Sequence, residues 1–468
     1  MSVSALSVLA AASEAPDRAA IVHENGDVLT FGDVAKHVTN VMHWLRRRVP
    51  ADVRAVAVVA TLRVDVIIAF HALIELGIPV VPLHPRWTAR ERENVVQMLG
   101  VDLVLDDDWR MTAGDAEPSA LEPRAIDPES ALAILLTSGT SGSPKGVFLS
   151  RRAFVASAAA STQNLGWTDE DRWLLSMPLA HVGGLSVVIR CLIARRAVAL
   201  VPWSGDPNAL AASIAHCRAT IVSFVPTLLR KVLDARPDPV FPSSVRAILV
   251  GGDAAPAALL DECRARRVPA LATYGMTETC AQVATQAPGE EPSVEAGVGR
   301  PLPGIELRIR SGEIEVRGPN LLSGYLPRDS FPNPFTEDGW FRTGDLGELD
   351  DRGRLHVRGR RSALIITGGE NVDPLEIERV LVACSEVREA CAFGVPDDHW
   401  GQVVAAAVVA RDPSTFDRDQ VEAAIRDLAK FKRPRMIAVV DALVTNATGK
   451  VDRNATATAA RARLEPVR

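Results

Sequence analysis

Short apolar runs alternate with helically spaced apolar residues along most of the chain, starting near Arg54. The pattern predicts strands at 55–60, 79–83 and 101–105 and helices at 64–76 and 87–99. It returns with predicted strands at 220–225, 245–250 and 270–273 and helices at 227–235 and 256–266. Strands separated by single helices are typical of parallel sheets with helices on both faces. We therefore predict an α/β region of two doubly covered, mostly parallel sheets.

The pattern changes after residue 304. Residues 305–310 and 313–317 alternate apolar and polar positions around Ser311-Gly312, which predicts a hairpin. Similar short pieces up to Arg358 predict a small β-barrel-like subdomain. Beyond it, strands are predicted at 364–366, 390–395 and 403–409, with helices at 374–384 and 418–428. We expect an N-terminal domain at 1–359 and a mobile, small α+β C-terminal domain at 360–468, joined by a hinge at 358–362.

Composition narrows the class of protein. The 468 residues are 47% hydrophobic and 24% charged, as in a multidomain globular protein. The net charge of −6, with no basic stripe, gives no reason to expect nucleic acid as a partner. No apolar run reaches the roughly 18 residues of a membrane span, and no positive charge precedes Arg18, so neither a membrane segment nor a secretory signal is expected. Six cysteines without a CxxC pair predict reduced thiols in a cytoplasmic enzyme.

A loop rich in glycine, serine and threonine follows the apolar run 131–136. Residues 137–146 read Thr-Ser-Gly-Thr-Ser-Gly-Ser-Pro-Lys-Gly, so backbone N–H groups, hydroxyls and one ammonium can face an anion. Pro144 stands where the common P-loop has its second glycine, so that fold is not implied. A flexible, solvated loop is the alternative. The candidate phosphate ligands are Thr137, Ser138, Gly139, Thr140, Ser141, Gly142 and Lys145.

A second motif, Tyr-Gly-Met-Thr-Glu-Thr at 274–279, follows the predicted strand 270–273. Ligands of open α/β sheets bind beyond the carboxyl ends of the strands, which is where this segment falls. Tyr274, one of only 2 tyrosines, can stack a purine there, and Glu278 can hold Mg²⁺. The same residues would also begin a helix well, which is the alternative interpretation.

Three further motifs carry single charged residues. Asp345 follows Gly344 and can accept hydrogen bonds from two ligand hydroxyls, or from its own backbone as a turn residue. Arg360 lies in Gly-Arg-Arg-Ser at 359–362, and Lys450 lies in Gly-Lys-Val-Asp-Arg at 449–453.

These five motifs, in this order, resemble those of the adenylate-forming superfamily, which includes acyl-CoA synthetases, luciferases and adenylation domains. The resemblance implies an AMP-forming acid–thiol ligase that uses ATP, Mg²⁺ and coenzyme A on a small carboxylic acid. The acid and ATP would form an acyl-adenylate, after which the C-terminal domain would rotate and the CoA thiol would displace AMP. Ser362 stands where the family usually has Asp or Lys at the hinge.

The resemblance also implies roles for individual residues. Lys450 and Thr277 would contact the reacting carboxylate and α-phosphate, and Lys145 would join them as a catalytic residue. Glu278 would bind Mg²⁺. The nucleotide would contact the phosphate loop, Gly251, Tyr274, Gly275, Asp345 and Arg360.

The segment Met-Pro-Leu-Ala-His-Val-Gly-Gly-Leu-Ser at 177–186 matches the family's acyl pocket. Adenylation domains for amino acids carry an Asp in this region, whereas this segment has His181 and no carboxylate, so the acid is expected to lack an amine. The resemblance to the family further implies an aryl dicarboxylic acid. His181 is read as an acid contact or as a packing or gating ring. The other candidate acid contacts are Gly252 and Gln282, and Arg190 and Ser186 join Gln282 as candidates for a second carboxylate. A ligase for another aryl or medium-chain acid, and an enzyme that loads a carrier protein, remain alternatives.

Overall fold

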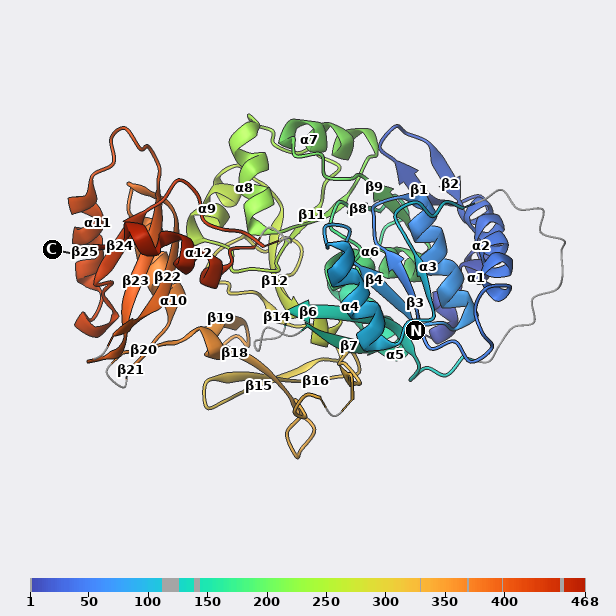
Figure 1. Ribbon diagram of the computed structural model, residues 1–468. Helices are drawn as coiled ribbons and strands as arrows, with labels where there is room; N and C mark the ends of the chain where they lie inside the picture. Colours follow the sequence, from blue (N-terminus) through green and yellow to red (C-terminus); the bar gives the residue numbers. More distant parts are fainter. Residues whose placement is uncertain are drawn as a thin grey trace. The chain divides into compact units, whose positions relative to one another are not determined.

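The computed structural model describes residues 2–111, 126–138, 144–328, 330–367, 370–397, 399–446 and 450–467. The chain divides into two compact units (Figure 1). Unit 1 contains 1–252, 262–307 and 316–341, and unit 2 contains 253–261, 308–315 and 342–468. In the described parts of the chain, no helix is long and apolar enough to cross a membrane.

The larger sheet of unit 1 is parallel through its centre and antiparallel at both edges. Every residue of its central strands β9 and β11 is buried, as expected for strands covered on both faces. In order across the sheet, the strands are β14 (Arg300–Pro301), β13 (Ala281–Thr285), β12 (Ala270–Met276), β11 (Ala247–Val250), β10 (Ile221–Phe224), β8 (Arg172–Leu175), β9 (Ala197–Leu200), β1 (Ala19–His23) and β2 (Val28–Thr30).

The second sheet of unit 1 is also mixed, with parallel pairing from β5 to β6 and antiparallel pairing beyond. Its strands in order are β17 (Gly324–Leu326), β7 (Pro144–Ser150), β6 (Ala131–Ser138), β4 (Val80–Leu83), β3 (Val56–Val59) and β5 (Leu103–Leu105). Both sheets therefore confirm the prediction of mostly parallel sheets.

The helices begin and end where local chemistry favours it. Thr88 and Glu91 form a capping box at the start of α4, and Gly100, with a φ of 60°, ends it. Helix α3 is buried along nearly its whole length and ends at Gly77. The helices before residue 270 are α1 (Val8–Glu14), α2 (Phe31–Arg46), α3 (Val64–Leu76), α4 (Ala89–Leu99), α5 (Arg151–Leu165), α6 (Val182–Ala194), α7 (Pro207–His216), α8 (Pro226–Ala235) and α9 (Ala257–Ala265).

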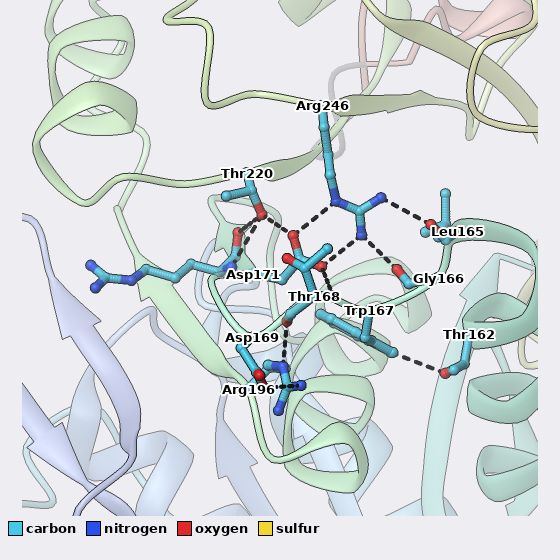
Figure 2. Close-up of polar contacts among 11 residues, drawn as sticks. Thr162, Leu165, Gly166, Trp167, Thr168, Asp169, Asp171, Arg196, Thr220 and Arg246 are labelled. Carbon is cyan, nitrogen blue, oxygen red and sulfur yellow. Dashed lines mark hydrogen bonds and ion pairs between the residues drawn. The ribbon is translucent and has the colours of Figure 1, made fainter.

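A buried ion pair joins distant segments of unit 1 (Figure 2). Asp171, 2% exposed, accepts two hydrogen bonds from the Arg246 guanidinium, at 2.8 and 2.7 Å. Its carboxylate also accepts from the Thr220 hydroxyl at 2.6 Å and the Thr168 N–H at 2.7 Å. Burial raises the pKa of Asp171, but these donors outweigh it and hold the pKa below its ordinary value. The pair connects the segment after α5 to the starts of β8, β10 and β11.

The predicted hairpin is present as β15 (Glu306–Arg310) and β16 (Glu313–Arg317), which belong to a sheet with β18 (Phe341–Leu349) and β19 (Leu355–Arg360). The prediction of β structure here is confirmed, but the described strands form an open four-stranded sheet, in the order β15-β16-β18-β19, rather than a barrel. Strands β18 and β19 pair antiparallel, with Asp345 opposite Arg360.

The rest of unit 2 is an α+β fold built on the long antiparallel pair β22–β23. Ile377 and Leu381 of α10 are buried in the cluster that includes Val404 and Val408 of β23, which explains why this helix covers the sheet. Its strands are β20 (Ile365–Thr367), β21 (Glu370–Val372), β22 (Val387–Asp397), β23 (Gly401–Ala410), β24 (Met436–Val439) and β25 (Glu465–Pro466), and its helices are α10 (Pro374–Ala383), α11 (Arg418–Ala424) and α12 (Arg453–Ala460).

All six cysteines are free thiols. Burial raises the pKa of Cys263, Cys280 and Cys391 to about 12, and raises those of Cys191 and Cys217 as well. Only Cys384, after α10, is partly exposed.

Candidate functional site

The predicted phosphate loop connects the two strands of a hairpin. Strands β6 and β7 pair antiparallel, with Thr137 opposite Lys145 and Ser138 opposite Pro144. The Thr137 hydroxyl oxygen is buried and has no hydrogen-bond partner among the described residues. Such a group is costly unless a ligand or water satisfies it, so it suits a phosphate site. The candidates Gly139, Thr140, Ser141 and Gly142 lie outside the described residues.

Lys145, Glu278 and Tyr325 meet beside this hairpin. The Lys145 ammonium lies 3.4 Å from Glu278 Oε1 and 3.8 Å from the centre of the Tyr325 ring. The Tyr325 hydroxyl donates to the same Oε1 at 3.2 Å. Glu278 is 9% exposed, so its charge is held in place by a cation and a hydroxyl. The structure thus joins two residues predicted from separate motifs and adds Tyr325 to them.

The segment with Tyr274 and Glu278 corrects the predicted end of the strand. The sequence predicted that the strand stops at Thr273, whereas β12 continues to Met276 and a 3-10 helix covers Thr277–Thr279. The chain then returns antiparallel as β13. A Cβ on Gly275 would lie 1.7 Å from the Ala281 carbonyl oxygen, so only glycine allows this pairing. Long-range pairing therefore extended the strand beyond its apolar run.

A tight turn after Glu278 sets this return. Cys280 and Ala281 have φ values of 50° and 81°, which are unfavourable for residues with a side chain. Two hydrogen bonds hold the turn: Asn320 donates to the Thr279 carbonyl at 2.8 Å, and Ser157 donates to the Cys280 carbonyl at 2.6 Å. Backbone strain next to Glu278 is therefore held by side chains from other segments.

Gly251 and Gln282 lie on either side of Thr273. A Cβ on Gly251 would lie 2.5 Å from Thr273 Cγ2, so this position needs glycine for the close packing of β11 and β12. The Gln282 side chain donates to the hydroxyls of Thr285 at 2.9 Å and Thr273 at 3.3 Å. Its Oε1 is buried without a partner in the described part of the chain. Gln282 is therefore fixed in orientation and retains an unused acceptor.

The proposed acid-pocket segment is compact because of its glycines. His181 directly precedes α6, and a Cβ on Gly184 would lie 2.3 Å from the Pro178 carbonyl oxygen. The His181 ring centre lies 5.4 Å from that of His84, at the end of β4. The two sheets of unit 1 thus bring one histidine each to this position.

Ser186 and Arg190 are the other candidates for binding a second carboxylate of the acid, and they differ in the hydrogen bonds that they already make. Ser186 donates its hydroxyl to the Gly183 carbonyl within α6, at 2.9 Å. Arg190 is 4% exposed and donates to the Ser157 hydroxyl at 3.2 Å. Burial lowers the pKa of Arg190 to about 10, and the groups that oppose this shift are the thiols of Cys280 and Cys191. Among the described residues, the groups that oppose the lowered pKa of this buried charge are thiols rather than carboxylates.

Unit 2 contains the predicted residues Asp345, Arg360 and Lys450. Arg360 Nε lies 3.0 Å from Asp345 Oδ1, joining adjacent strands. The Asp345 N–H donates to the Thr343 hydroxyl at 3.0 Å, and the Gly344 N–H donates to Glu313 at 3.0 Å. Asp345 is 5% exposed, whereas the Arg360 side chain is 59% exposed. The backbone around Asp345 is thus held by neighbouring side chains, and its buried carboxylate pairs with a largely exposed guanidinium.

Lys450 lies in the same charged neighbourhood of unit 2. Burial lowers its pKa, an effect opposed by the carboxylates of Asp253 and Asp345 and reinforced by Arg360. The Lys450 N–H donates to Asn446 Oδ1 at 3.1 Å. The structure therefore brings together three residues predicted from separate motifs: Lys450, Asp345 and Arg360.

Glu278 is the candidate metal ligand. Among the described residues, no group of three or more His, Cys, Asp or Glu side chains could hold a metal ion. Magnesium commonly takes one or two carboxylates and completes its shell with water and substrate phosphates. Glu278, a single carboxylate beside Lys145, fits this mode of Mg²⁺ binding.

Known protein families and solved structures match this chain. The profile described as AMP-binding enzyme matches residues 8–326, and the AMP-binding enzyme C-terminal domain matches residues 376–450. The chain belongs to the AMP-binding enzyme family. The 2-succinylbenzoate–CoA ligase of Bacillus licheniformis is 35% identical to this AMP-binding enzyme, with 94% of this chain and 96% of the relative covered. That of Bacillus mycoides is 36% identical, with 93% and 94% covered.

Solved structures agree with this assignment. The o-succinylbenzoate CoA synthetase of Bacillus subtilis, in complex with the acyl-adenylate intermediate OSB-AMP, superposes with a TM-score of 0.86 at 32% identity, covering 96% of each chain. The ATP-bound MatB from Rhodopseudomonas palustris superposes with a TM-score of 0.85 at 29% identity, covering 94% and 95%. The predicted fold class and superfamily of this AMP-binding enzyme are confirmed.

Sequence reasoning missed several residues that support the site. Tyr325 is the second of the 2 tyrosines, and nothing local in the sequence linked it to Glu278. Asn320 and His84 gave no signal, because each acts through a contact with a distant segment. Asp253 was missed for the same reason, because its neighbour Lys450 lies far away in the sequence.

Proposed function

We propose that this protein is an ATP-dependent o-succinylbenzoate–CoA ligase that works through an acyl-adenylate, in a step of menaquinone biosynthesis. The observation that carries the proposal is its identity of 35% to a 2-succinylbenzoate–CoA ligase over 94% of its length. The two clusters of predicted residues, one in each unit, support the same chemistry.

In the first half-reaction, the acid carboxylate attacks the α-phosphorus of ATP and pyrophosphate leaves. Lys145 and the Thr137 hydroxyl hold the phosphates, and Thr277 contacts the α-phosphate and the acid. Tyr274 stacks the adenine, while Asp345 accepts hydrogen bonds from the ribose hydroxyls. Mg²⁺ held by Glu278 supplies charge neutralisation on the phosphates. Such reactions gain most of their rate from positioning and electrostatics.

Lys450 supports the same step from unit 2. Its ammonium bridges the acid carboxylate and the α-phosphate, and its lowered pKa reflects a partly dehydrated charge, which interacts more strongly with anions. The domain from residue 360 then rotates about 358–362, and the CoA thiol displaces AMP. We place this hinge where β19 ends and the 3-10 helix Arg361–Ala363 begins.

The acid is proposed to carry a second carboxylate. The pocket segment lacks the carboxylate that an amine would need, and Arg190 is a buried cation whose lowered pKa is opposed, among the described residues, by thiols rather than carboxylates. A second carboxylate on the acid would neutralise this charge. Gln282 does not pair with this carboxylate in its present orientation, because its amide N–H groups donate to Thr285 and Thr273 and only its acceptor oxygen is left.

A panel of acids tests the proposal. CoA-dependent AMP formation is measured with o-succinylbenzoate, benzoate, octanoate and free amino acids, and the first should give the highest kcat/KM. A site built to pair a second carboxylate rejects acids that lack it by up to about 10⁴-fold, because buried polar groups are then left unpaired. A fatty or simple aryl acid with the highest kcat/KM would contradict the proposed substrate. Replacing CoA by a carrier-protein thiol identifies the natural acceptor.

A further inference from the structure

His84 stands out because the proposed chemistry does not use it. It ends β4, is 3% exposed, and its ring lies against that of His181 with centres 5.4 Å apart. The ring centre of Trp87, on the same turn, lies 6.2 Å from the ring centre of His84. A buried histidine is thus in ring contact with the residue placed in the acid pocket.

The turn after β4 fixes the tautomer of this histidine. The Arg86 N–H donates to His84 Nδ1 at 3.1 Å, so Nδ1 is the acceptor and a neutral ring must carry its proton on Nε2. Burial lowers the pKa of His84, and the charges of Arg86 and Arg92 lower it further, so the neutral ring prevails at neutral pH.

The Nε2–H that results has no use inside the protein. Nε2 is buried and has no hydrogen-bond partner among the described residues. A buried donor without an acceptor costs free energy, so such a group in a native protein needs an explanation, for example a functional role in binding a ligand.

The backbone turn that carries the ring is also held in place. The Trp87 N–H donates to the His84 carbonyl at 3.0 Å, and Arg92 of α4 donates to the Pro85 carbonyl at 2.6 Å. Thr88 and Glu91 then start α4 through their capping box. The donor is therefore preorganised, which strengthens recognition.

We propose that His84 is a specificity-determining residue whose Nε2–H donates a hydrogen bond to an oxygen of the carboxylic acid held beside His181. The proposal rests on the proposed function, since it assumes that His181 contacts the acid. An anionic or carbonyl oxygen suits this donor, whereas a hydrocarbon chain would leave it unsatisfied.

Two substitutions separate recognition from structure. His84→Asn keeps an acceptor near Nδ1 for the Arg86 N–H and removes the donor at Nε2. His84→Gln places an amide N–H near the position of Nε2. We expect His84→Asn to raise KM for the acid about tenfold or more, with KM for ATP unchanged, and His84→Gln to recover part of the loss. Thermal unfolding of each variant provides the structural control.

The outcomes are distinct. An unchanged KM for the acid in His84→Asn, an equal rise in KM for ATP, or loss of folded protein in both variants would overturn the role of His84. The measurement uses whichever acid the unmodified enzyme prefers in the panel. A preference for another acid would therefore contradict the proposed substrate and still leave the role of His84 tested.

Discussion

Two ion pairs of unit 1, Asp171–Arg246 and Lys145–Glu278, are built differently. Asp171 receives four short hydrogen bonds, and Arg246 also donates to the carbonyls of Leu165 and Gly166, at 2.9 and 2.5 Å. Glu278 meets Lys145 at 3.4 Å and the Tyr325 hydroxyl at 3.2 Å, both through Oε1. The first pair is saturated and holds segments together. The second is loosely made, which suits groups that must exchange partners with a ligand.

Breaking the saturated pair should give the largest effect on stability. Asp171→Asn would leave the partly buried Arg246 charge without its carboxylate. Because the Arg246 side chain is 27% exposed, the loss should lie at the low end for a buried pair, about 3 kcal/mol. Chemical denaturation should show this loss, while kcat per folded molecule stays near that of the unmodified enzyme. The pKa of Asp171 is lowered in the folded state, so its stabilisation is present above the unfolded pKa and is lost as the pH falls through the folded pKa. The stability of Asp171→Asn should therefore depend less on pH in the acid range.

Lys450→Ala should reduce activity rather than stability. Losing one charge contact to the transition state costs roughly 3–4 kcal/mol, about a hundred- to a thousandfold in rate. Pyrophosphate exchange should fall by that factor while a supplied acyl-adenylate is converted to thioester normally. Equal damage to both half-reactions would refute the assignment of Lys450 to adenylation.

Glu278→Gln tests whether the loose pair serves function rather than stability. Adenylation should fall about a hundredfold because the ligand for Mg²⁺ is lost, and the fall should be only partly restored by raising the Mg²⁺ concentration. The free energy of unfolding should change by about 1 kcal/mol or less, since the pair is long and partly exposed. A loss of stability as large as that of Asp171→Asn would erase the distinction between the two pairs.

Tyr325→Phe should give the smallest effect. It removes the hydroxyl that donates to Glu278 but keeps the ring beside the Lys145 ammonium. A single hydrogen bond of this kind contributes about 1 kcal/mol, so kcat/KM should fall by about fivefold. Loss of the ring as well, in Tyr325→Ala, should cost more. Equal losses in the two variants would show that the cation–π contact contributes nothing.

The sequence predicted elements well where local chemistry decides them. The helix 64–76 was predicted to the residue, because an apolar run ends at Gly77 in the left-handed conformation. The hairpin around Ser311-Gly312 was also predicted correctly, because a two-residue turn separates two alternating strands. The strand after Ala270 was predicted too short, because its last residues pair with β13, which periodicity does not record.

The site followed the same division. Motif order supplied Lys145, Glu278, Asp345, Arg360 and Lys450, and the structure groups them into two clusters. It could not supply Tyr325, which lies 47 residues from its partner Glu278, or the His84–His181 contact between two sheets. Those contacts depend on how strands from separate sheets meet, and no local pattern encodes that.

The distribution of the thiols has a practical consequence. Alkylating reagents react with thiolates, so cysteines that are buried and have raised pKa values are protected from them. Cys384 alone is partly exposed, and it follows α10 in unit 2. The native chain thus offers one attachment point for a fluorophore without any cysteine having to be removed. A dye placed there would report on the domain that carries Lys450 while the enzyme turns over.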